Sequence, residues 1–403
     1  MAQPSSHLSD SAPPSLGWLC SFVVLVALLG GCSSAEASEE GPDAPPASVD
    51  GPLDLDDVSI LFPLPKSLSN DGLLAASASV GANRELLPRS LATRLPLLQE
   101  DPRATYDSLH VVSVRLDPCF REAGARQDAC KRQVRFVLQP LALSEKGEVS
   151  TIDAAAHVFY ELPNEPFVAL LRGLLEARPR PARGPLGVHR TLAQQGLEGP
   201  FARILKDRLT VAAASASLVR VTFMSLRGRG NEWQFGGFRV TADGTVSPLG
   251  VVPSRANVQS LVLQTTDSAF VKSIAPAIAD SALAPLLDTT TLRAATPEAR
   301  EEALRAANRI ENPAFRSSED TDCASCHTTS SSKHWAERVL SVRSSVDQFE
   351  SPTFDLSVSE TPASDLAVLR AFGYVGGAPF ASPRTIHESA AAARISNGLL
   401  AEK

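Results

Sequence analysis

The chain has 403 residues, a hydrophobic fraction of 43% and a formal net charge of −7 at pH 7. This apolar content is ordinary for a globular protein, and the length leaves room for more than one domain. The acidic excess argues against a nucleic acid as partner, because phosphate recognition needs a basic surface. The composition therefore predicts a globular protein that binds no nucleic acid.

An apolar run occupies the N-terminal region from Trp18 to Leu29. It is too short to span a bilayer and has the length of a secretory signal. The sequence LLGGC follows, with two small residues ahead of Cys32. This resembles the lipobox of bacterial lipoproteins, which implies that residues 1–31 are a signal peptide and that acyl chains, palmitate among them, are attached at Cys32. The lack of Asp after the cysteine implies the outer membrane of a Gram-negative bacterium. A plain signal peptide or a misread start is the alternative.

Residues 32–57 are rich in Pro, Ala and acidic side chains. Such a composition cannot bury enough apolar surface to fold alone. We therefore expect a solvated tether between the lipid and a domain that begins at residue 58.

Strand-like runs dominate residues 58–290. They are rich in β-branched and aromatic residues, with turn signals between them, over 58–65, 109–117, 133–143, 152–162, 218–226, 233–241 and 258–265. Asp243 and Gly244 predict a tight hairpin, and apolar residues at helical spacing predict helices over 165–179 and 199–214. The expected fold class is α+β, with an antiparallel, sandwich-like domain. Its role is not indicated by any motif.

Four cysteines remain after the signal and the lipid are accounted for. In an oxidising compartment, Cys119 and Cys130 are expected to form a disulfide across a short loop between two strands. Two buried thiols, or pairing with Cys323 and Cys326, are the alternatives.

Residues 291–403 are predicted to be mostly helical, and the helical pattern already begins over 270–287. Thr296 is an expected N-cap with Pro297 in the first turn, further helical runs are expected over 331–346 and 365–373, and a last helix is expected to begin at Ser382 and Pro383. This segment contains the sequence CASCH at 323–327.

The CASCH sequence resembles the haem-attachment site of c-type cytochromes. The resemblance implies one covalent haem c per chain, held by thioethers from Cys323 and Cys326, with His327 as the proximal iron ligand. It implies a cytochrome c-like segment that carries electrons to an envelope redox partner. Candidates for the distal ligand are His387, Met224 and His334, and an open or water-bound iron is the remaining possibility.

Other functions remain open at this stage. Cys323, Cys326, His327 and His334 could bind zinc, and the cysteines could form a redox pair or a structural disulfide. The chain could also be a non-catalytic lipoprotein that binds a partner or ligand through its β-rich domain, or a haem peroxidase-like enzyme. An electron carrier or binding protein is favoured over an enzyme. His110, His157 and His189 are expected to be structural.

Overall fold

The computed structural model describes residues 52–402 apart from gaps at 69–71, 82–83, 97–100, 122–128, 180–183, 227–230, 252–255, 267–268 and 359–364. The predicted signal peptide, Cys32 and all but the end of the predicted tether lie outside the described residues. These described residues belong to one unit, Ala47–Lys403, which continues across the boundary expected at residue 290. No helix within the described ranges is both long and apolar enough to span a membrane.

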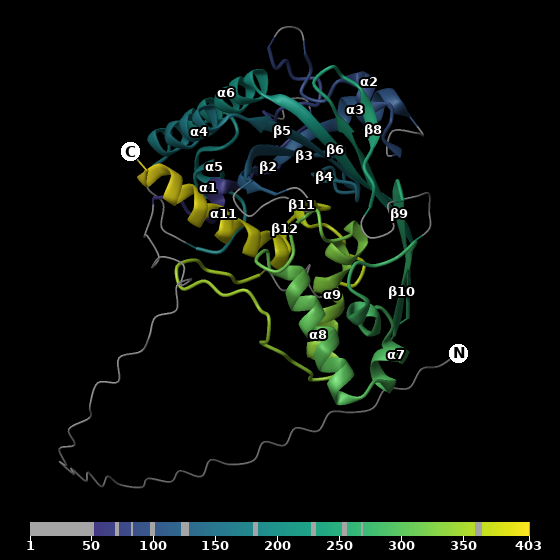
Figure 1. Cartoon of the computed structure of the whole chain (residues 1–403). Coiled ribbons are helices and arrows are strands. Elements are labelled where there is room, and N and C mark those ends of the chain that lie inside the picture. The colour runs from purple at the N-terminus through teal and green to yellow at the C-terminus, as the bar shows by residue number, and fades with distance from the viewer. Residues whose placement is uncertain are drawn as a thin grey trace, which may run out of the picture. The chain divides into compact units, whose positions relative to one another are not determined.

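A ten-stranded antiparallel sheet forms the centre of the fold (Figure 1). Its strands run in the order β1-β2-β3-β5-β6-β7-β9-β10, while β4 pairs with β3 and β8 with β7. Their bounds are Ser59–Leu61 (β1), Leu109–Phe120 (β2), Lys131–Leu143 (β3), Val149–Thr151 (β4), Ala155–Leu162 (β5), Ser217–Leu226 (β6), Glu232–Val240 (β7), Val246–Pro248 (β8), Val258–Thr265 (β9) and Phe270–Ala275 (β10). A separate hairpin joins β11 (Phe372–Val375) and β12 (Ala378–Ala381).

Helices cover the sheet on both sides. Their bounds are Leu55–Val58 (α1), Arg89–Ala92 (α2), Pro102–Ser108 (α3), Asn164–Ala177 (α4), Arg190–Gln195 (α5), Pro200–Ser215 (α6), Ser281–Leu287 (η2), Thr289–Ala294 (α7), Pro297–Glu311 (α8), Cys323–Val339 (α9) and Pro383–Ala401 (α11). Helices α4 and α6 lie at one end of Figure 1, and α7, α8 and α9 gather at the other.

The two faces of the sheet differ in chemistry because side chains alternate along each strand. Phe136 and its cross-strand partners Val114 and Val158 belong to a buried apolar cluster. Helices α4 and α6 contact this part of the sheet through β3 and β5. The opposite face carries arginines and aromatic residues, and the C-terminal elements α9 and α11 lie on that side.

The α+β class is confirmed, with one large antiparallel sheet and a C-terminal helical part. The sheet is one continuous path of paired strands rather than two facing sheets. Thr296 caps α8 and Ser382 caps α11, as predicted. The disulfide between Cys119 and Cys130 is also present, and it links the end of β2 to the start of β3.

Three expectations differ from the structure. Residues 270–275 form strand β10 rather than helix, because Phe270–Ala275 finds a complete antiparallel partner in β9. The predicted helical run at 365–373 is likewise wrong: residues 365–371 form no helix, and the last two residues of the run belong to strand β11. The end of the predicted tether is folded: Leu53 is buried, and Asp54 and Asp57 form a capping box on α1.

The hairpin at Asp243 and Gly244 connects β7 to β8, as the sequence indicates. Gly244 adopts φ +82°, a conformation that glycine reaches without steric cost. The Asp243 carboxylate accepts a hydrogen bond from the Thr245 backbone N–H at 3.0 Å.

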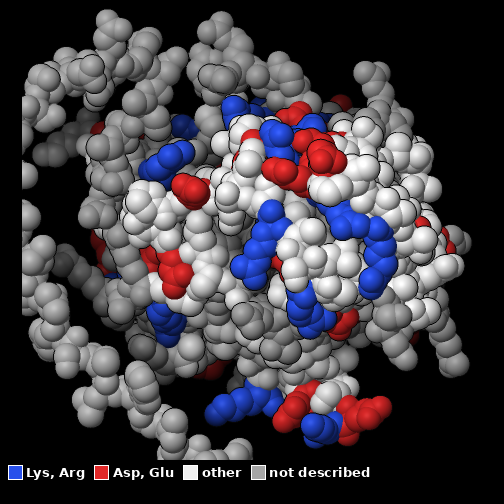
Figure 2. Space-filling model, turned by 90° about the horizontal axis from the view of Figure 1, so that it is seen from below, with Lys and Arg blue, Asp and Glu red and all other residues white. Residues whose placement is uncertain are grey.

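Charged side chains of both signs lie next to each other on the molecular face shown in Figure 2. A more unusual concentration of charge lies inside the molecule, between the sheet and α11, beside the cysteine motif.

Candidate functional site

The CASCH sequence forms the first turn of α9, and its position is fixed by Asp322. Asp322 caps the helix by accepting a hydrogen bond from the Ser325 backbone N–H at 3.0 Å. The same carboxylate accepts from Nε2 of Gln259 on β9 at 2.7 Å, and Gln259 accepts from the Ala324 backbone N–H at 2.9 Å. Both Asp322 and Gln259 are buried. The sheet therefore holds the helix end that carries the cysteines.

The imidazole of His327 is oriented by a backbone carbonyl. Its Nδ1 is bonded to the carbonyl of Leu369, which can only accept, so Nδ1 carries the proton. Burial lowers the pKa of His327 to about 4. The ring is therefore neutral at neutral pH and leaves Nε2 as its lone-pair donor, the form in which histidine ligates metals.

All three motif residues line one cavity of about 150 Å³ between α9 and the sheet. The wall opposite the motif is made by β3, β5, β6 and β7. Its main side chains there are Arg135, His157, Phe159, Arg220, Thr222, Met224 and Phe235.

Register explains why these sheet residues share a wall. Met224 pairs with Ala155 on one side and Phe235 on the other, so it points to the same face as both. Phe235 lies against the motif, with its ring centroid 5.0 Å from that of His327. Met224, one of the expected candidates for a distal ligand, is therefore in the motif's cavity and is 1% exposed.

The other two distal candidates lie elsewhere. His334 and His387 line a second cavity of about 250 Å³ together with Glu311 and Lys333. His387 donates from Nδ1 to the Glu311 carbonyl at 2.9 Å and stacks on Phe349 at 5.1 Å between centroids. The structure thus brings Met224 to the cysteine motif and leaves His387 and His334 with another group of residues.

The two motif cysteines are not bonded to each other. Burial raises the pKa of Cys323 to about 12 and that of Cys326 to about 11. Reactive redox thiols have lowered pKa values, because the thiolate is the nucleophile. Within the described part of the chain, no three His, Cys, Asp or Glu side chains are grouped as a metal would need, the proposed zinc set included.

His157 is the member of this site that sequence reasoning missed. It was expected to be structural, yet it lines the cavity on β5, opposite Thr222 of β6. Burial, with further contributions from Arg135 and His327, lowers its pKa well below the usual value. The signal for its position is two-residue alternation with Phe159, which becomes informative only once the β5–β6 register is known.

Of the other two histidines, His189 has a plain structural role. It is buried, its Nδ1 accepts from the Leu192 backbone N–H at 3.4 Å to cap α5, and its ring stacks on Phe201. His110 donates from Nδ1 to the Ser108 carbonyl at 2.9 Å, at the start of β2.

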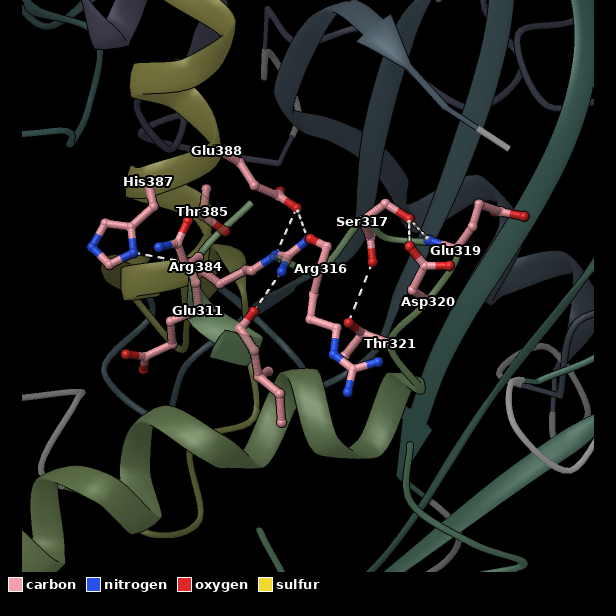
Figure 3. A network of polar contacts seen from close by, with 12 residues as sticks. Glu311, Arg316, Ser317, Glu319, Asp320, Thr321, Arg384, Thr385, His387 and Glu388 are labelled. Carbon is pink, nitrogen blue, oxygen red and sulfur yellow. Dashed lines mark hydrogen bonds and ion pairs between the residues drawn. The ribbon is translucent and has the colours of Figure 1, made fainter. Parts of the chain in front are cut away.

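Beside the motif, α11 and the segment before α9 form a dense polar network (Figure 3). Arg384 is at its centre: it donates hydrogen bonds to Glu388 on the next turn at 2.7 Å and to the Arg316 carbonyl at 2.8 Å.

Comparison of the chain with models of protein families, with curated proteins and with solved structures finds no match. The site is therefore interpreted from its own geometry.

Proposed function

We propose that the chain is an envelope-anchored, c-type cytochrome-like lipoprotein that transfers electrons. Cys323 and Cys326 would hold one haem c by thioethers, with His327 as the proximal ligand. The observation that carries the proposal is that these three residues line one cavity, with the His327 ring aimed by the Leu369 carbonyl. Histidines that ligate metals usually donate their other ring N–H to a protein acceptor in this way, which fixes the tautomer and the orientation of the ring.

The residues at the site fit a haem chemically. Neither thiol is consumed by a disulfide, and His327 presents a neutral ring with an unprotonated Nε2. The cavity of about 150 Å³ is smaller than the roughly 300–1,000 Å³ common for small-molecule sites. A haem would therefore need the walls to separate, and a neighbouring cavity of about 480 Å³ shares Arg135, Ser318 and Arg384 with this one.

When bound, the haem would supply reversible one-electron chemistry at iron. The chain's own contribution would be a buried, largely apolar wall from Met224 and Phe235, which limits water at the ligand. Met224 is the distal-ligand candidate that shares the cavity with His327. The disulfide at Cys119 and Cys130 supports an oxidising compartment, in line with a lipidated protein of the outer membrane.

A peroxidase-like enzyme is the second candidate, and His157 favours it. Such chemistry needs an open iron position and a nearby acid or base. His157 lies in the cavity with its pKa lowered, so it would be a neutral imidazole able to accept a proton.

The test is expression with the genuine signal in a host that matures c-type cytochromes, followed by intact mass and peroxidase staining of the denatured protein. We expect the added mass of one haem in the wild type and none in the Cys323→Ser/Cys326→Ser variant. A wild-type mass of polypeptide and lipid alone would refute the proposal.

The reduced-minus-oxidised spectrum then separates the two candidates. An electron carrier gives a sharp six-coordinate pattern that Met224→Leu abolishes and His387→Gln leaves in place. A peroxidase-like site gives a high-spin pattern that responds to peroxide, and His157→Phe removes that response.

A further inference from the structure

A row of four arginines crosses the sheet beside the cysteine motif. Arg115 of β2 pairs with Arg135 of β3, and Arg135 pairs with Phe159 of β5. Phe159 pairs with Arg220 of β6, which pairs with Arg239 of β7. Direct cross-strand partners point to the same face, so these five residues form one line, which we call the arginine row.

Phe159 stacks against the two arginines of the row that lie on either side of it. The guanidinium of Arg220 lies 4.0 Å from the centre of the Phe159 ring, and that of Arg135 lies 4.8 Å from it. Stacking on an aromatic face fixes the plane of a guanidinium, and hence the directions of its N–H groups. Arg135 and Arg220 are therefore held in place by the ring, whereas the Arg239 side chain at the end of the row is 42% exposed.

Carboxylates neutralise only part of this charge. Asp117 bridges Arg115 at 2.7 Å and Arg135 at 3.1 Å. Glu319 bonds to Arg220 and Arg239, and Glu388 bonds to Arg115 and to Arg384 of α11. In the ion pairs between described residues, the four row arginines and Arg384 share three carboxylates, so guanidinium groups outnumber carboxylates there.

A buried hydrogen-bond donor without an acceptor costs free energy, and one such donor atom is found on each of two row arginines. The Nε atoms of Arg135 and Arg220 are buried and lack a hydrogen-bond partner among the described residues. The Arg220 side chain is only 6% exposed, and burial lowers its pKa to about 10 despite its contact with Glu319. An anion that reached the Nε atom of Arg135 would relieve the unfavourable free energy of that unpaired donor.

A cavity of about 480 Å³ lies at one end of this row, where Arg115 and Arg135 line it, and its volume is within the size range of small-molecule sites. Its basic lining residues are Arg115, Arg121, Arg135, Arg316, Arg384 and Arg394, against Asp117 and Glu388. Figure 3 shows the α11 side, where Arg384 and Glu388 point toward the segment that carries Arg316. Arg135 lines both this cavity and that of the cysteine motif.

We propose that this cavity is a binding site for a small anion that carries carboxylates, with Arg135 as its principal contact. Guanidinium groups bind carboxylates through two parallel hydrogen bonds, and the cavity lining holds more guanidinium groups than carboxylates, which suits an anion with two or three carboxylates. Two sources present this chemistry: a free organic acid, or the two propionates of a covalently attached haem. The proposal does not rest on haem attachment, because the row and its cavity exist in the chain as described.

The first experiment uses citrate as probe and the full-length Cys323→Ala/Cys326→Ala variant, which cannot attach haem. We expect saturable binding by calorimetry and a rise in Tm with citrate. Arg135→Gln in the same background should weaken binding about tenfold or more, since a hydrogen bond to a charged group is lost. Arg203→Gln, an exposed arginine on α6, is the matched control and should leave binding unchanged.

A variant that binds citrate more tightly provides a second test, because a gain of affinity cannot result from unfolding of the protein. Glu388→Gln removes a carboxylate that competes for Arg115 and Arg384, so citrate should bind several-fold more tightly. Non-saturable binding in the parent, or equal binding in Arg135→Gln, would overturn the proposal, as would weaker binding in a folded Glu388→Gln variant.

The second experiment repeats the titration on haem-loaded protein. If attached haem weakens citrate binding at least tenfold, the propionates occupy the row. If citrate binds equally well, the site is for a free organic acid. A chain that never loads haem refutes the cytochrome proposal alone, because the first experiment is then still decisive for the arginine row.

Discussion

The imidazole of His327 is bonded through Nδ1 to the backbone carbonyl of Leu369, 42 residues further along the chain. The next residue, Arg370, anchors that carbonyl: its Nη2 donates to Asp153 at 3.0 Å and to the Ala154 carbonyl at 3.2 Å. The orientation of the motif histidine is therefore set by an arginine that is buried at the end of the sheet.

Arg370→Met is expected to raise the pKa of His327, because the positive charge of Arg370 contributes to lowering it. A variant in which the Leu369 carbonyl moves away would instead show a lower pKa, since that hydrogen bond raises it. Stability should fall by about 1.5–3 kcal/mol as the hydrogen bonds to Asp153 and Ala154 are lost. NMR titration of the histidine Cε1 protons and urea unfolding measure the two effects. Arg203→Met is the control, and an unchanged His327 titration in the Arg370 variant would contradict this account.

Asp322→Ala is expected to destabilise the protein by about 2–3 kcal/mol. It removes the N-cap of α9, usually worth about 1 kcal/mol, and one of the two acceptors of the buried Gln259 amide, which still donates to the Ala277 carbonyl. It also removes the acceptor of the Ala279 backbone N–H. Asp322→Asn keeps a cap acceptor and should cost less. Asp101→Ala, which removes the more exposed cap of α3, is a comparison in which only capping is lost. Equal losses at Asp101 and Asp322 would show that the link to β9 contributes nothing.

Acid should destabilise the fold partly through Glu311. Burial acts to raise the pKa of this carboxyl, but the ion pair with Lys333 at 2.7 Å outweighs it, and the pKa is lowered. A lowered folded-state pKa gives stability that is complete above the unfolded value of about 4.3 and is lost as pH falls through the folded value. The free energy of unfolding should therefore fall less steeply in Glu311→Gln than in the wild type when the pH is lowered from about 7 to about 3, a range that includes the unfolded-state pKa.

The Cys119→Ser/Cys130→Ser variant should lose about 3 kcal/mol of unfolding free energy, because the disulfide closes a short loop of the unfolded chain. Urea unfolding measures this loss. Reducing agent should destabilise the wild type by a similar amount and leave the double variant unaffected. A wild type that is insensitive to full reduction would contradict the assignment.

Local patterns predicted individual elements well. Thr296 and Ser382 mark true helix starts because a hydroxyl followed by proline satisfies the first turn whatever the surroundings. The disulfide was equally predictable, since two cysteines at the ends of adjacent strands must lie close together. Residues 270–275 were misassigned because their apolar spacing suits a helix or an edge strand, and only the open edge of β9 decides between them.

The composition of the site was only partly predictable. The CASCH motif identifies three residues by their spacing, and alternation places Met224 and Arg220 on one face of β6. No local pattern in the sequence shows which strands are neighbours in the sheet. The sequence therefore could not predict that His157 lies at the site or that the arginines form a row. Distance along the chain favoured His387 as the partner of His327, yet its helix turns that ring toward Glu311.

The carbonyl that orients His327 belongs to a residue that is synthesised after the motif. The cysteines and the histidine are synthesised at least 42 residues before Leu369. The new chain therefore contains the whole motif before it contains the carbonyl that orients the imidazole. A chain cut short ahead of Leu369 would keep every letter of CASCH and lose the direction of its imidazole.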